Sequence, residues 1–167
     1  YKKLAIARAA LAELKGRYSS EIQYLSVRYE SNKSDIDILV SYCGILKKYI
    51  ESGLLDGRSY KKYLRIYSQV LSDLIESDAS EEKHFVEKIN CDLKMGDFVS
   101  AREYCSSFYT RHNNSEEAYV MYMKLYYMLG DYNSLSGMLR SMKELPLNLS
   151  NRAVNIQRFW SKGGLYE

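Results

Sequence analysis

Proline is almost missing from this chain of 167 residues, which contains only Pro146. Domains rich in strands or loops use proline at turns and sheet edges, so its scarcity favours a helical chain. The three cysteines, Cys43, Cys91 and Cys105, form no CxxC pair and are odd in number. They therefore predict reduced thiols in a cytoplasmic protein rather than a disulfide framework.

Long apolar runs, a strong net charge and catalytic motifs are missing too. No run approaches the roughly 18 apolar residues that a membrane helix needs. A net charge of +3 does not by itself indicate a nucleic acid or a membrane as partner. No metalloprotease, nucleophile-elbow, P-loop or dinucleotide motif occurs, and the two histidines have no ligand cluster with zinc-site spacing. We therefore expect no enzyme activity, no metal, no cofactor and no membrane segment.

The candidate for nucleophilic catalysis is the pair His84 and Cys91, seven residues apart on one predicted helix. That spacing corresponds to about 10 Å along the helix axis. A cysteine–histidine nucleophile needs direct hydrogen-bond contact between the two side chains. We therefore interpret Cys91 as a packed cysteine rather than a catalytic one.

The clearest positive signal is a repeat between Ser80 and Leu147. The triplet glycine-aspartate-aromatic occurs at Gly96 and again at Gly130, 34 residues later. Each copy opens with Ser-Glu-Glu, at Ser80 and Ser115. Serine can cap the N–H groups of a first helical turn, and glutamates suit the positive end of the helix dipole. Glycine takes the left-handed conformation that ends many helices, so the pattern predicts two helical hairpins with their turns at the glycines.

This period resembles that of the tetratricopeptide repeat, a family of paired helices that stack into a superhelix. The family's aromatic, small and apolar positions fall on Phe85, Ile89, Gly96, Phe98, Ala101, Cys105 and Phe108, then on Tyr119, Tyr122, Met123, Tyr126, Gly130, Tyr132, Leu135, Leu139, Met142 and Pro146. Lys88 and Asp92 depart from the pattern, because the family places apolar residues there. Leu135 departs because the family's residue is small. The resemblance implies an all-α fold: a right-handed superhelix of antiparallel helical hairpins, in a single domain over residues 1–167.

Helical periodicity extends over the rest of the chain. Before the repeats we predict helices over 3–15 and 18–30, joined at Gly16 as a degenerate hairpin, and helices over 35–52 and 58–75. After Pro146 we predict a capping helix over 148–161, because the open end of a solenoid exposes apolar surface. With four helices in the central repeats, 80–147, the total is about nine.

A ligand groove follows from the resemblance, since the first helix of each tetratricopeptide hairpin lines the concave surface. The family's ligand-facing positions fall on Lys83, Val86, Asn90, Leu93 and Lys94, then on Glu117, Val120, Lys124, Tyr127 and Met128. We take Lys83, Asn90, Lys94, Lys124 and Tyr127 as the candidate binding residues. An amide can bond a peptide backbone, and lysines can hold a carboxylate. The alternative is that these side chains are simply solvated.

Basic residues interleaved with tyrosines also suit stacking on nucleic acid. The basic groups are Lys47-Lys48, Arg58 with Lys61-Lys62 and Arg65, and Arg102 with Arg111. They are spread among acidic residues, and hairpins of this length leave no tight helix-turn-helix unit. We therefore do not expect direct contact with nucleic acid. A helical repeat that binds nucleic acid is kept as the second alternative interpretation.

Residues from about Ile36 to Trp160 resemble, more narrowly, the bacterial transcriptional activator domain. The points of likeness are the break at Leu54-Leu55-Asp56-Gly57, the aromatic-rich helix after it, and the Ser-Glu-Glu-Ala-Tyr opening at Ser115. This resemblance implies a non-catalytic protein–protein interaction module, the regulatory or oligomerisation part of a larger regulator, with a protein or peptide partner and self-association as a second mode. A peptide-binding or chaperone-like repeat is the first alternative. Because the sequence begins at Tyr1 rather than methionine, we also expect it to be a fragment.

Overall fold

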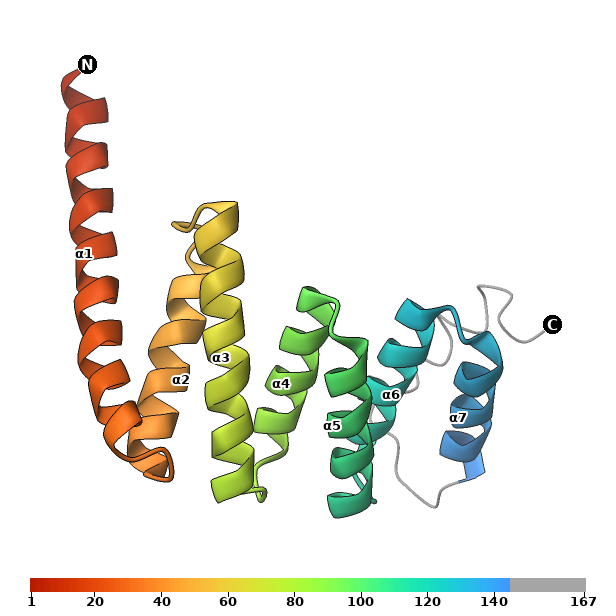
Figure 1. Cartoon of the computed structure of the whole chain (residues 1–167). Coiled ribbons are helices and arrows are strands. Elements are labelled where there is room, and N and C mark those ends of the chain that lie inside the picture. Colours follow the sequence, from red (N-terminus) through yellow and green to blue (C-terminus); the bar gives the residue numbers. More distant parts are fainter. Residues whose placement is uncertain (145–167) are drawn as a thin grey trace. The chain divides into compact units, whose positions relative to one another are not determined.

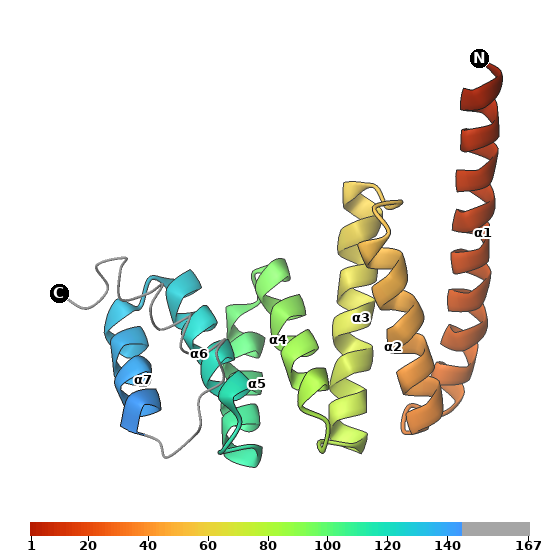
Figure 2. The same cartoon turned by 180° about the vertical axis from the view of Figure 1, so that it is seen from behind.

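The computed structural model describes residues 1–144 and shows seven helices and no strand in that range (Figures 1 and 2). The helices are α1 (Lys2–Ser31), α2 (Ile36–Glu51), α3 (Gly57–Ser77), α4 (Glu82–Met95), α5 (Phe98–Arg111), α6 (Glu116–Leu129) and α7 (Tyr132–Glu144). The all-α prediction is confirmed for this part of the chain. The chain divides between Ser80 and Glu81 into two compact units: unit 1, residues 1–80, holds α1 to α3, and unit 2, from residue 81, holds α4 to α7.

Unit 1 is a row of antiparallel helices in which α2 packs against both α1 and α3. Asp35 and Asp56 cap α2 and α3, because their carboxylates accept hydrogen bonds from the backbone N–H groups of Ile38 and Ser59. The interior is made of aliphatic and tyrosine side chains, among them Leu39, Leu46, Leu64, Val70, Leu71 and Leu74. Tyr29 ties α1 to α3, because its hydroxyl donates a hydrogen bond to the Asp73 carboxylate.

The predicted turn at Gly16 is wrong, because α1 is one continuous helix from Lys2 to Ser31. A helix that ends on glycine needs a positive φ, and the described glycines with positive φ are Gly53, Gly96 and Gly130. Gly16 is followed by an arginine, whereas Gly96 and Gly130 are each followed by an aspartate that caps the next helix. Without that cap, the alanine- and leucine-rich surroundings keep the helix going.

Unit 2 contains the two predicted hairpins, α4–α5 and α6–α7. Gly96 and Gly130 take φ values of +74° and +69° and end the first helix of each pair. Asp97 and Asp131 then accept hydrogen bonds of 3.1 Å from the backbone N–H groups three residues later. Within this unit α4 contacts both α5 and α6, and α6 contacts α7. The glycine-aspartate turns are therefore confirmed.

Two other boundary predictions fare differently. Ser115 caps α6 as predicted, with its hydroxyl accepting from the Ala118 N–H. The prediction that Ser80 caps α4 is wrong, since Glu81 occupies that position without a side-chain cap. The reason is local: the backbone N–H of Ser80 donates 2.9 Å to the Asp78 carboxylate, which holds Ser80 in the turn after α3.

The helix count of nine is corrected to seven for residues 1–144. One of the two fewer helices is explained by Gly16, because α1 continues through the predicted turn as a single helix. The other is the capping helix over 148–161, which lies outside the described residues together with Pro146. The single-domain assignment over residues 1–167 stays a prediction.

The core of unit 2 follows the repeat pattern closely. Phe85 of α4 stacks on Phe108 of α5, with ring centroids 5.1 Å apart, and both side chains are fully buried. Ala101 and Leu135 occupy the same repeat position in the two hairpins, and both are fully buried although they differ in size. The larger leucine is thus accommodated in the second hairpin without leaving the core.

Candidate functional site

The five predicted binding residues all lie on the first helices of the two hairpins. Lys83, Asn90 and Lys94 belong to α4, and Lys124 and Tyr127 belong to α6. These two helices contact one another. All five side chains are exposed or half-buried, so none is consumed by the core.

Three of the five come together where α4 meets α6. The Lys124 Nζ donates a hydrogen bond of 2.5 Å to the Asn90 Oδ1. Asn90 and Lys124 are 34 residues apart and therefore occupy the same position in successive repeats. Lys94 lies one turn further along α4 from Asn90, on the same side of the helix. We refer to Asn90, Lys94 and Lys124 as the lysine cluster.

The surroundings of the lysine cluster disfavour the charged form of Lys124. The pKa of the Lys124 ammonium is lowered, first because partial burial removes water from it and second because the positive charge of Lys94 is close. Within the described residues, neither lysine forms an ion pair with a carboxylate. The neighbour that Lys124 does have is a neutral amide, which offsets none of its charge. An anion placed here would interact favourably with both lysines.

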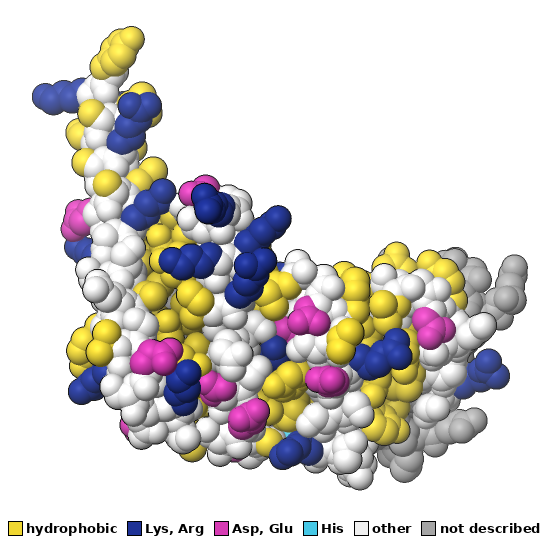
Figure 3. All heavy atoms as spheres, viewed as in Figure 1, with side chains coloured by type: hydrophobic (Ala, Val, Ile, Leu, Met, Phe, Trp, Pro, Cys, Tyr) yellow, Lys and Arg dark blue, Asp and Glu magenta, His cyan; other side chains and the backbone are white. Residues whose placement is uncertain are grey.

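Lys83 and Tyr127 stand at different distances from this cluster. Lys83 is in the first turn of α4, two turns or about 10 Å along the helix from Asn90. Tyr127 is 47% exposed, and Met128 beside it is 45% exposed. Both lie one turn from Lys124 on α6, where residues three and four apart share a face. Hydrophobic side chains gather over α6 on the face seen in Figure 3. The cations therefore border an apolar surface.

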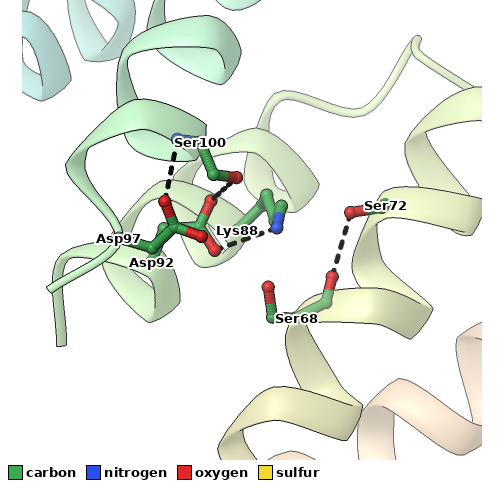
Figure 4. Close-up of polar contacts among 6 residues, drawn as sticks. All are labelled: Ser68, Ser72, Lys88, Asp92, Asp97 and Ser100. Atoms are coloured by element: carbon green, nitrogen blue, oxygen red, sulfur yellow. Dashed lines mark hydrogen bonds and ion pairs between the residues drawn. The ribbon is translucent and has the colours of Figure 1, made fainter. Parts of the chain in front are cut away.

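Sequence reasoning missed a second charged group, which is buried between α4 and α5. Lys88 Nζ donates 2.9 Å to Asp92 Oδ1, and Ser100 Oγ donates 2.6 Å to Asp92 Oδ2 (Figure 4). The Lys88 and Asp92 side chains are 5% and 0% exposed. Lys88 also lies over the Tyr104 ring, 4.8 Å from its centroid. The signal was present as a lysine and an aspartate four residues apart, the spacing of helical ion pairs.

Burial keeps two of the three cysteines, Cys91 and Cys105, from being activated thiols. Burial raises the pKa of the Cys91 thiol to about 12, and the nearby Asp92 charge adds to the effect. Burial likewise raises the pKa of Cys105 to about 12. A nucleophilic cysteine needs a lowered pKa. These two thiols stay protonated at neutral pH, which suits the packed role predicted for Cys91.

In residues 1–144, no three or more His, Cys, Asp or Glu side chains are arranged to hold a metal ion. None of the described helices combines the length and the apolar character needed to span a bilayer. Comparison of the sequence with protein-family models and with curated proteins gives no match.

Proposed function

We propose that this chain is a non-catalytic protein–protein interaction module built of tetratricopeptide-like hairpins. The support is the period of 34 residues, the left-handed glycine that ends the first helix of each hairpin, and the contact between α4 and α6. In a right-handed superhelix of such hairpins, the first helices stand next to each other and line one surface. Residues on that surface are free to bind a segment of another protein.

The observation that carries this proposal is the lysine cluster. Lys94 and Lys124 come from neighbouring helices, and the pKa of Lys124 is lowered by burial and by Lys94. Two like charges held together in this way destabilise the fold slightly. Groups that are unfavourable for stability and have perturbed pKa values concentrate at binding sites. The cluster is therefore our candidate for ligand recognition.

The chemistry of the cluster selects a peptide carboxylate flanked by an apolar side chain. Both ammonium groups can donate to one carboxylate, at a peptide C-terminus or on an acidic residue. The Asn90 amide can form hydrogen bonds with the peptide backbone. When its carbonyl does so, it no longer accepts from Lys124, and the Lys124 ammonium can bind the ligand. Tyr127 and Met128 supply the apolar surface beside the charge.

The test compares peptides with a free C-terminal carboxylate and the same peptides amidated, using fluorescence polarisation on the whole chain. The best binder from a carboxylate-ended library serves as the probe. Lys94→Met and Lys124→Met keep the aliphatic stem but remove the charge, so each should weaken binding roughly tenfold. Lys48→Met, an exposed lysine on α2, is the matched control and should leave affinity unchanged.

A second readout separates recognition from a merely structural role. Removing one of two like charges should leave stability unchanged or slightly raised, so Lys94→Met should bind less well without unfolding more easily. Equal affinity for the carboxylate and the amide, or unchanged affinity of both variants, would remove the lysine cluster as the binding site.

The finer assignment, to the regulatory or oligomerisation part of a bacterial transcriptional regulator, rests on the resemblance of residues from about Ile36 to Trp160. Such a part is expected to associate with itself. Sedimentation velocity of the chain across a wide concentration range tests this role. A strict monomer at the highest concentration would count against it and leave the peptide-binding role standing.

A further inference from the structure

The first half of α1 extends beyond the helices that it packs against. α1 is 30 residues long, whereas its neighbour α2 has only 16. Figures 1 and 2 both show the N-terminal half of α1 standing clear of the ends of α2 and α3. This free half, residues 2–15, is about 20 Å long. A helix of this length that touches nothing is marginal in water on its own.

The free half carries a direct continuation of the packing face of α1. Tyr18, Ile22, Leu25 and Tyr29 form the part of this face that is buried or half-buried in unit 1. At 100° per residue, Leu4, Ala7, Leu11 and Leu14 fall in the same arc, which is about 80° wide. These three leucines are 54%, 48% and 41% exposed. We call Leu4, Ala7, Leu11 and Leu14 the free stripe.

A row of aromatic rings lies at the C-terminal end of the free stripe. The Tyr18 ring stacks on the Tyr49 ring at 4.9 Å, and Tyr49 contacts Tyr63 at 5.2 Å, so one ring comes from each helix of unit 1. Lys62 lies at the far end of this row, with its Nζ 5.6 Å from the Tyr63 centroid. The free stripe and the row of rings together form a corner. It is bounded by the free half of α1 and by the adjacent ends of α2 and α3.

Positive charge predominates at this corner. On α1, Lys3, Arg8 and Lys15 flank the free stripe. On α3, Arg58, Lys61, Lys62 and Arg65 are exposed and line a shallow depression. Figure 3 shows the same arrangement as a hydrophobic patch between α1 and α3 with Lys and Arg side chains around it. Glu13 lies on the side of α1 away from the stripe and is bonded to Arg17 at 2.6 Å. Asp56, which caps α3, is an acidic group close to Lys15.

The charges argue against a second copy of this chain as the occupant. The free stripe has the 3-4-3 spacing of a coiled-coil seam. The residues on either side of it therefore take the positions that, in a coiled coil, lie against the residues flanking the seam of the partner helix. In a pair of α1 helices, those positions would bring Lys3, Arg8 and Lys15 against each other in either orientation. Like charges at these positions destabilise the pair, whereas glutamates or aspartates would stabilise it.

We propose that the free half of α1 and the aromatic row bind an amphipathic helix with acidic flanks. The apolar face of that helix covers Leu4, Leu11 and Leu14, and its end rests against the half-buried Tyr18 ring. Its carboxylates lie next to Arg8 and Lys15 on one side and to the basic residues of α3 on the other. This surface belongs to unit 1 and shares no residue with the lysine cluster, so either can fail without the other.

The experiment uses the whole chain and two synthetic helical peptides of about 18 residues, long enough to be partly helical. Both have leucines at heptad a and d positions, and they differ only in glutamate or lysine at the flanking positions. Titration calorimetry at low salt should show the glutamate peptide binding at least roughly tenfold tighter, and added salt should reduce the difference.

A matched pair of variants locates the site. Leu11→Asp places a negative charge in the middle of the free stripe and should weaken the glutamate peptide roughly tenfold or more. Val27→Asp changes an exposed valine on the opposite face of the same helix and should have no effect. Circular dichroism of both variants checks that the helix content is kept, which is expected because both side chains are exposed.

Three results would overturn the proposal. The first is equal affinity for the two peptides, or unchanged affinity of Leu11→Asp. The second is a dimer of the chain alone that Leu11→Asp dissociates, which would assign the stripe to a second copy. The third is binding to vesicles containing phosphatidylserine, lost in Leu11→Asp, with no peptide bound, which would assign it to a membrane surface.

Discussion

Asp92 shows how a charge is tolerated inside a helical repeat. Its side chain is fully buried, one oxygen accepts from Lys88, and the other accepts from the Ser100 hydroxyl. Taking both charges out of water costs several kcal/mol each, and the ion pair recovers much of that only while both partners are present. The pair connects α4 to α5 at a place where the repeat pattern has apolar residues.

Removing one member should therefore be far worse than replacing both. Lys88→Met removes the cation beside the buried Asp92 carboxylate and should lower the free energy of unfolding by about 3–5 kcal/mol. The double variant Lys88→Met/Asp92→Leu restores apolar residues at both positions and should come within about 1–2 kcal/mol of the wild type. Urea unfolding of the three proteins measures both numbers. A double variant as unstable as the single one would mean that the pair is required by its surroundings.

Cys91 and Cys105 should make the folded chain less stable at alkaline pH. Both thiols have a pKa raised to about 12 in the folded chain, from an ordinary value near 9. Above pH 9 the unfolded chain loses these protons and the folded chain keeps them, so the folded state binds more protons and stability falls as pH rises. Each thiol should lower the free energy of unfolding by on the order of 1 kcal/mol per pH unit between about 9 and 12.

Urea unfolding at pH 8 and pH 10 tests this sign. Cys105→Ala removes one of the two thiols and should reduce the pH dependence, although it also leaves a small cavity that lowers stability at both pH values. The folded chain should also react slowly with a thiol reagent at pH 8. Rapid labelling of Cys91 without unfolding would show that its thiol is neither buried nor held protonated.

At the scale of helices and turns, glycine has opposite meanings at two positions. Gly16 lies inside α1 with ordinary helical φ, whereas Gly130 ends α6 with φ +69°. A Cβ at either position would meet no atom within 4 Å, so packing does not distinguish them. Backbone conformation alone decides the effect of adding a side chain.

Alanine at these two positions should change stability in opposite directions. Gly16→Ala should raise the free energy of unfolding by up to about 1 kcal/mol, because glycine is a poor residue in a helix. Gly130→Ala should lower it by about 1–2 kcal/mol, because alanine is strained in the left-handed region. Thermal unfolding followed by circular dichroism gives both values. A loss of stability in Gly16→Ala would instead support the two-helix interpretation of α1.

These glycines also show what the sequence could and could not predict. The turns at Gly96 and Gly130 were predictable because the stop signal, the capping aspartate and the 34-residue period all agree. Gly16 misled because a glycine followed by an aromatic two residues later resembles that turn, while the deciding feature is the missing cap. The sequence placed Asn90 and Lys124 at equivalent repeat positions, and the contact between them is a finding of the structure. The burial of Lys88 and Asp92 did not, because their spacing also fits a solvated ion pair.

For the whole molecule, charge separates the two proposed surfaces. Residues 1–80 contain 13 Lys and Arg against 10 Asp and Glu, which accounts for the entire net charge of +3. The basic corner of unit 1 therefore lies in a unit with a net positive charge, whereas the lysine cluster lies in a unit with equal numbers of acidic and basic residues. Partner binding at the corner should depend more on ionic strength than peptide binding at α4 and α6.

The division between Ser80 and Glu81 makes a prediction about folding. Unit 1 has its own buried set on α2 and α3, including Leu39, Leu46, Leu71 and Leu74, and a chain of 80 residues is long enough to be stable alone. A fragment of residues 1–80 should therefore be helical by circular dichroism and should melt cooperatively as a monomer. Because Leu4, Leu11 and Leu14 are exposed already, cutting the chain at residue 80 leaves them as they are. If the fragment is unfolded while the whole chain is folded, the two units depend on each other and the chain behaves as the single domain that the repeat pattern predicts.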